Sequence, residues 1–235
     1  ASYLPADLLS TVEIVGDGAD INFEIISAFG ADAIVASQYN VDAFGYRDQA
    51  EAITRLEAVD VAPLTPWQVT LREIGTAFGV PQRTEARIAE AEMLIADLSA
   101  SLTDEQRALE VSVIRCRLDN CRYQPGGTSF AGQVLDDLGV ARPEVQASDA
   151  EGRPTVVVSF EQIDLLSGDV VILFGTDAED ALVTLQDSAL WNLIPAVQNG
   201  HVFQVDEDAW FFGNVLAAEY VARDMVEILQ TVAPG

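Results

Sequence analysis

Three arginines, Arg115, Arg117 and Arg122, lie close together in the segment VIRCRLDNCRYQ (Val113–Gln124), in a chain with nine other arginines and no lysine. A guanidinium group binds oxygen anions through a fixed fork of donors and stacks on aromatic rings. The segment follows the apolar run LEVSVI, and ligands of parallel α/β folds gather at the carboxyl ends of strands. Alternation along a strand places Arg115 and Arg117 on one face. We therefore expect Arg115 or Arg117 to bind an anionic ligand, followed by Arg122 and Tyr123.

The same segment contains both cysteines of the chain, Cys116 and Cys121, separated by RLDN. This spacing suits a disulfide across a short β-hairpin with its tip near Leu118 and Asp119, which would indicate an oxidising compartment. Two free thiols are the alternative. A zinc site is a poor fit, because His201 is the only histidine and lies far along the chain.

The charge balance excludes several partners. With 38 acidic residues and a net charge of -26, the chain would repel nucleic acid and anionic lipid surfaces. No run approaches the roughly 18 to 20 apolar residues of a membrane-spanning helix. The acidity also fits a solvated surface suited to high salt or to the outside of a cell, and the clustered arginines could merely offset the nearby carboxylates Asp119, Asp136 and Asp137.

A nucleotide-dependent enzyme is the rival from another class, but its motifs are missing. The segment GDGAD (Gly16–Asp20) lacks the third glycine of G-x-G-x-x-G, and GK[ST] does not occur in the sequence. One histidine at the start of an apparent strand does not make a Ser-His-acid set. The sequence therefore favours a binding protein over an enzyme.

Two similar segments indicate two lobes. In INFEIISAFGADAIVAS (Ile21–Ser37), a helical pattern ends at a glycine and a buried strand follows. The segment VSFEQIDLLSGDVVILF (Val158–Phe174) repeats the pattern 137 positions later, with Phe-Glu and an aspartate in register. Chance similarity between amphipathic units is the alternative to two lobes of similar construction.

Between these segments, PQRTEARIAEAEMLIADLSASL (Pro81–Leu102) opens with proline and has no internal Gly or Pro, which predicts one long helix of about 33 Å. Beyond it, strand and helix patterns alternate, and SALWNLIPAVQNG (Ser188–Gly200) reads as one helix on which we assign Trp191 to packing. We predict an α/β fold of two Rossmann-like lobes with parallel sheets. The predicted boundaries are 1–80, a connecting helix at 81–102, and 103–235.

These segments, with RYQPGGTSFAGQVLDDLGVARP and LWNLIPAVQNGHVFQVDEDAWF, resemble the substrate-binding proteins of ABC importers for iron-siderophores, cobalamin and haem. The resemblance covers essentially the whole chain. It implies two α/β lobes bridged by one helix, with the ligand held in the cleft between them and no enzyme activity or cofactor. It also implies export or a lipid anchor, contact with a membrane only through that anchor or a permease dimer, and we expect a monomer. Such proteins usually begin with a further strand and helix, so the first lobe is expected to be incomplete at its start.

The resemblance assigns roles to further residues. Each lobe of such a protein presents a glutamate to the permease, and the motif positions carry over to Glu24 and Glu161. The alternative is that each is a first-turn carboxylate favoured by the helix dipole. In the cleft, the arginines favour an anionic ferric siderophore over cobalamin, and a tyrosine would suit haem. The other predicted ligand contacts lie at strand ends and are Tyr39, Tyr46, Arg47, Trp67, Trp210 and Phe211.

Overall fold

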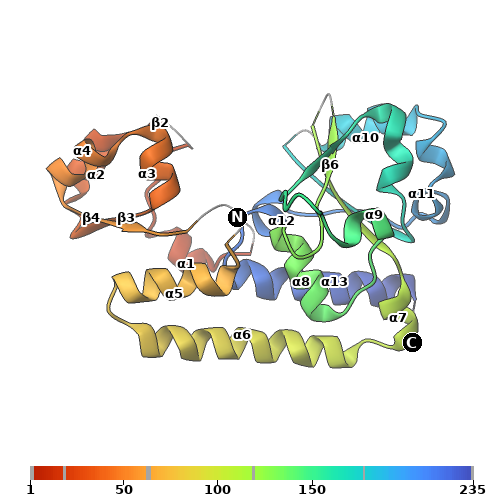
Figure 1. The fold of residues 1–235 in the computed structure, drawn as a ribbon, viewed down its shortest axis with the longest axis horizontal. Coiled ribbons are helices and arrows are strands. Elements are labelled where there is room, and N and C mark those ends of the chain that lie inside the picture. The colour runs from red at the N-terminus through yellow and green to blue at the C-terminus, as the bar shows by residue number, and fades with distance from the viewer. Residues whose placement is uncertain (1–2, 18–19, 62–64, 118–119, 177, 234–235) are drawn as a thin grey trace. The chain divides into compact units, whose positions relative to one another are not determined.

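A computed structural model describes residues 3–17, 20–61, 65–117, 120–176 and 178–233 of the chain. The chain divides into two compact units, Leu4–Ile88 and Ala89–Gly235, and the second also includes Ala1–Tyr3. The division falls inside α6 (Pro81–Ser101), the long helix that the sequence predicts (Figure 1). In the described ranges, no helix is both long and apolar enough to span a bilayer.

The first unit is built around two parallel strands. Strand β3 (Ala33–Ser37) pairs with β4 (Arg55–Val59), and α2 (Phe23–Phe29) precedes β3. The carbonyl of the Asn22 side chain accepts the first free amides of α2, and Gly30 ends the helix at φ 68, which a residue with a side chain rarely adopts. The other elements of this unit are α1 (Ala6–Leu9), β1 (Gly16–Asp17), β2 (Asp20–Ile21), α3 (Gln38–Phe44), α4 (Arg47–Ile53) and α5 (Trp67–Ala77).

The second unit contains a five-stranded sheet in the order β7-β6-β5-β8-β9. The three strands β5, β8 and β9 are parallel, as predicted, whereas β6 runs antiparallel to β5 and β7. The short connection from β5 allows only antiparallel pairing, so β6 is the strand of this sheet that departs from the parallel arrangement. The strands are β5 (Val111–Cys116), β6 (Cys121–Tyr123), β7 (Val156–Val158), β8 (Val170–Phe174) and β9 (Val202–Gln204).

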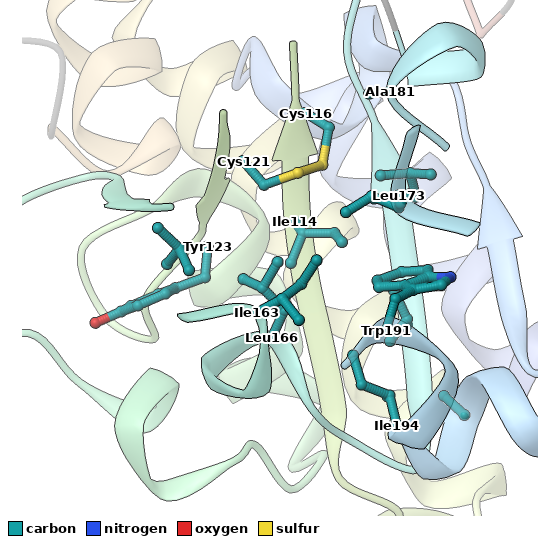
Figure 2. Close-up of a cluster of buried hydrophobic side chains, with 14 residues drawn as sticks. Ile114, Cys116, Cys121, Tyr123, Ile163, Leu166, Leu173, Ala181, Trp191 and Ile194 are labelled. Carbon is teal, nitrogen blue, oxygen red and sulfur yellow. A yellow bond between two sulfur atoms is a disulfide. The ribbon is translucent and has the colours of Figure 1, made fainter. Parts of the chain in front are cut away.

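Different helices cover the two faces of this sheet. On one face, Ile114, Leu173 and Trp191 belong to a continuous buried cluster, shown in Figure 2. Trp191 is 1% exposed, which confirms its predicted packing role. The elements of this face are η1 (Phe160–Leu166), α10 (Ala178–Gln186), η2 (Trp191–Leu193) and α11 (Pro195–Asn199).

The opposite face carries helices that pack on one another, α8 (Phe130–Leu138), α12 (Glu207–Phe211) and α13 (Val215–Val232). Helix α8 has the predicted ends, with the Ser129 hydroxyl accepting from the Gly132 amide and Gly139 in the left-handed conformation. Two short helices, α7 (Asp104–Ala108) and α9 (Glu144–Ala147), complete the described elements of this unit.

Two helix predictions were wrong in detail. The helix expected over Ser188–Gly200 is divided, because Pro195 cannot donate a hydrogen bond and disfavours helical geometry at Ile194, whose ψ is 129. The two similar segments also differ: α2 is a regular α-helix, whereas η1 is a 3-10 helix interrupted at Gln162. The strands that follow them, β3 and β8, form as predicted.

Candidate functional site

The two cysteines form a disulfide at the end of the β5–β6 hairpin. Cys116 lies directly opposite Cys121 in the strand pairing, and both are completely buried in the cluster of Figure 2. This confirms the predicted disulfide; the predicted tip at Leu118 and Asp119 lies outside the described residues. The bond fixes the register of the hairpin and therefore the side chains that alternate with the cysteines.

The arginines occupy the other face of the hairpin. Arg115 lies directly opposite Arg122, and directly opposed residues of an antiparallel pair project to the same side. The Arg117 amide continues the ladder by donating to the Asn120 carbonyl at 2.9 Å, and alternation places its side chain on the Arg115 side. We call Arg115, Arg117 and Arg122 the arginine face. Opposed like charges destabilise a hairpin, so a role outside stability is the better explanation for this arrangement.

Arg115 is held by two residues of α12. Its Nε donates to Glu207 Oε1 at 2.6 Å, and its Nη2 donates to the same oxygen. Glu207 Oε2 accepts from the Thr176 hydroxyl at 3.2 Å. The guanidinium carbon lies 4.0 Å from the centroid of the Phe211 ring, within the range of a cation–π interaction. The predicted residues Arg115 and Phe211 are therefore brought together, at the carboxyl ends of β5 and β8.

The other two arginines are differently placed. Arg117 is exposed and Arg122 is half-buried. Within the described part of the chain, neither side chain has a carboxylate within 4.0 Å. The sequence offered nearby carboxylates as possible partners of these arginines. Of these, Asp136 accepts a hydrogen bond from the Gly127 amide at 2.7 Å, and Asp119 lies outside the described residues. Among the described residues, Arg117 and Arg122 are thus the members of the arginine face without a carboxylate partner.

Two predicted ligand contacts are core residues in this structure. Tyr123 is 5% exposed, because it lies two positions after Cys121 and therefore shares the disulfide face of the hairpin. Burial raises the pKa of its hydroxyl. Trp210 is completely buried, and its Nε1 donates to Asp224 Oδ2 on α13 at 2.8 Å. These placements give both rings a packing role.

The predicted contacts of the first unit are dispersed among three helices. Tyr39 on α3 is 55% exposed, whereas Tyr46 packs against Phe23 with ring centroids 5.9 Å apart. Arg47 binds Glu51 at 3.1 Å and Gln38 at 3.0 Å. Trp67 at the start of α5 is 3% exposed, and its Nε1 has no hydrogen-bond partner among the described residues. Tyr39 is therefore the most accessible aromatic of this set.

The two glutamates with a predicted docking role are both exposed. Glu24 lies in the first turn of α2, where its amide donates to Asn22 Oδ1 at 3.1 Å. Glu161 lies in the first turn of η1. A shallow groove of about 520 Å³ adjoins the first of them and is lined by Phe23, Glu24, Ser27, Ala28, Gln49 and Ile53.

Sequence reasoning missed the residues that support the site. Glu207 and Thr176 follow β9 and β8, and their position after parallel strands is the signal that could have found them. It also missed Arg142, which is 8% exposed and whose Nε donates to the Val111 carbonyl at 2.6 Å. Burial lowers the pKa of Arg142 to about 10. This arginine braces the start of β5, whereas Arg115 lies near its end.

Comparison with known proteins gives a consistent picture. The profile of the family described as periplasmic binding protein matches residues 4–209. The chain is 24% identical to the Fe(3+)-citrate-binding protein YfmC of Bacillus subtilis over 222 residues, which are 91% of this chain and 66% of that protein. It is 26% identical to the probable siderophore-binding lipoprotein YfiY of the same organism, over 95% of this chain and 70% of the relative. The chain thus spans about two thirds of the length of these relatives.

Solved structures agree on the fold. Staphylococcus aureus SirA complexed with staphyloferrin B superimposes with a TM-score of 0.76 at 23% identity, over 96% of this chain and 79% of SirA. At this level of identity, the similarity shows the two-lobe α/β fold alone. The ligand chemistry of this chain has to be argued from its own residues.

Proposed function

Because this chain belongs to the periplasmic binding protein family, we propose that it is the receptor of an ABC importer and binds a ferric siderophore complex. The observation that supports the proposal is the pairing of the β5–β6 hairpin, from which strand alternation assigns Arg115, Arg117 and Arg122 to one face. Two relatives are named for binding ferric citrate and a siderophore. We propose no catalytic role.

The chemistry of the arginine face suits an iron chelate. Siderophores bind ferric iron through oxygen anions, and the complex commonly retains negative charge at its surface. Guanidinium groups bind such oxygens through hydrogen bonds that carry charge. Phe211 beside Arg115 adds an aromatic surface. Cobalamin carries little net charge, so it would not require this face, and the relatives named above do not favour haem.

Transport requires a second interaction. We propose that Glu24 and Glu161 dock on a permease dimer, because both are exposed in first turns of helices that the sequence relates to one another. An extracytoplasmic location fits the disulfide, which persists in oxidising compartments. A lipid anchor would fit the relative named as a lipoprotein.

Isothermal titration calorimetry of the purified protein tests the ligand class. The titrants are ferric citrate, a ferric tris-catecholate siderophore, a ferric tris-hydroxamate siderophore, haem and cobalamin, each at low and physiological salt. We expect sub-micromolar binding of a ferric chelate that weakens with salt, since exposed charges are screened. Binding of haem or cobalamin alone would refute the siderophore proposal.

Uptake measurements test the docking role. We expect the double substitution Glu24→Ala and Glu161→Ala to abolish ligand uptake by cells while leaving calorimetric affinity unchanged. The matched control is Glu13→Ala with Glu144→Ala, which removes two carboxylates elsewhere on the described chain. Unchanged uptake, or an equal loss with the control pair, would contradict docking through Glu24 and Glu161.

A further inference from the structure

We propose that Glu207 sets the charge preference of the binding site by holding Arg115 as a neutral ion pair. This inference rests on the proposed function and narrows its ligand class. Arg117 and Arg122 are left as the cationic groups of the arginine face among the described residues, and the site then favours ferric complexes with one or two negative charges over trianionic tris-catecholates.

The contacts of Glu207 make it a fixed part of the site. One carboxylate oxygen takes both Nε and Nη2 of Arg115, and the other takes the Thr176 hydroxyl. The side chains of Arg115 and Glu207 are only 12% and 18% exposed. Salt and water screen such a pair less than an exposed one. An approaching ligand therefore meets a dipole at Arg115 and not a full positive charge.

The surroundings of Arg115 restrict what it can still donate. Its guanidinium carbon lies over the Phe211 ring, and Glu207 occupies the edge that carries Nε. Its Nη1 has no hydrogen-bond or ion-pair partner among the described residues. Arg115 can thus still donate hydrogen bonds to a ligand from Nη1 while contributing little net charge.

The charge at the face is smaller than its three arginines suggest. Glu207 neutralises one of them, and two are left without a carboxylate partner in the described ranges. Two more aspartates flank Glu207: Asp206, which accepts from the Asp208 amide at 2.9 Å, and the exposed Asp208 itself. These carboxylates lower the local potential further. A complex with one or two negative charges is matched by the face, and a trianion is not.

Glu207→Gln is the direct test, because the amide keeps an oxygen to accept from Arg115 and removes the charge. By calorimetry at low salt, we expect its affinity for a ferric tris-catecholate siderophore to rise about tenfold over that of the native protein, as one added unit charge at close range predicts. Physiological salt should shrink the gain. The affinity for an uncharged ferric tris-hydroxamate centre should stay within about twofold.

The matched control is Glu151→Gln. Glu151 is an exposed carboxylate paired with Arg153 at 3.1 Å, so its substitution changes the net charge of the chain equally, away from the arginine face. We expect it to leave every affinity unchanged. A similar gain from Glu151→Gln, or no gain from Glu207→Gln, would overturn the proposal.

The double substitution Arg115→Gln with Glu207→Gln provides a second test, which applies even if Glu207→Gln alone fails to fold. Replacing both partners of a buried ion pair is often neutral for stability, whereas removing one leaves a buried charge. If the pair is neutral to the ligand, the double variant keeps the native preference between singly or doubly charged ferric complexes and trianionic tris-catecholate complexes. If the double variant bound no anionic ferric complex, Arg115 itself would supply the positive charge that binds the ligand, and the inference would be refuted.

These outcomes separate this inference from the proposed function. Failure of the native protein to bind any ferric complex would contradict the proposed function. Native binding with no selective gain in Glu207→Gln would contradict only the role of Glu207.

Discussion

The two faces of the β5–β6 hairpin are built from alternating residues but have opposite chemistry. One face carries Cys116, Cys121 and Tyr123, all buried in the hydrophobic cluster. The other carries Arg115 and Arg122, directly opposed although like charges repel. A strand only six residues long thus both anchors the sheet and presents cations.

The difference shows how a costly charged face can be maintained. The disulfide and the packing of the first face fix the backbone, so the arginines cannot move apart by changing the register. Glu207 offsets one charge from a separate element, α12. We therefore expect substitutions on the disulfide face to lower mainly stability, and substitutions on the arginine face to lower mainly ligand affinity.

Tyr123→Ala should have the largest effect on stability. Removing a buried aromatic side chain leaves a cavity and costs about 3–4 kcal/mol. We expect this loss in denaturant unfolding, with ligand affinity unchanged for the fraction that remains folded. A large loss of affinity with little loss of stability would instead make Tyr123 a ligand contact, as the sequence alone predicts.

Replacing both Cys116 and Cys121 by alanine should have the next largest effect. Closing so short a loop stabilises the fold by about 2 kcal/mol in the chain-entropy description. We expect a fall of this size in the free energy of unfolding. Since register is also set by packing on the same face, calorimetric affinity should fall less than tenfold. Reduction of the native protein with dithiothreitol should reproduce both results.

Arg122→Gln should act in the opposite way. Losing one free guanidinium should weaken binding of an anionic ferric complex by about 1 kcal/mol, which is roughly fivefold. Stability should be unchanged or slightly higher, because the opposed charges of Arg115 and Arg122 are relieved. Arg153→Gln, which removes a guanidinium whose side chain is 45% exposed, is the control. Equal weakening by both variants would assign the effect to net charge.

The sequence predicted the hairpin better than its surroundings. Period-two alternation correctly separated Arg115 from Cys116, and the same rule, carried two positions past Cys121, would have placed Tyr123 in the core. Helix ends with local signals, Ser129 and Gly139, were also predictable. These features depend on residues that are close in the chain, so they can be predicted from a single sequence.

The partners of the arginine face were not predictable in this way. Glu207 lies 92 positions from Arg115, and only the strand order brings them together. The burial of Trp210 depends likewise on α13, which supplies its acceptor Asp224. Contacts between distant elements follow from the topology of the sheet, which local patterns do not specify.

The smallest expected effect is on the pH dependence of stability, and it involves Asp224, which accepts a hydrogen bond from Trp210 on α12. Burial is the main cause that raises the pKa of Asp224 above its ordinary value, and the hydrogen bond from Trp210 only partly opposes it. Between the ordinary and the raised pKa, the folded state binds more protons than the unfolded state, so stability falls as pH rises through this window. We expect Asp224→Asn, which keeps an acceptor for Trp210, to make the unfolding free energy less dependent on pH there and slightly higher at neutral pH. Glu105→Gln, which removes an exposed carboxylate on α7, is the control. If denaturant unfolding shows the same slope in Asp224→Asn as in the native protein, the Asp224 carboxylate that anchors α12 is not destabilised by burial. The charged support of the arginine face would then come from Glu207, without a second contribution from Asp224.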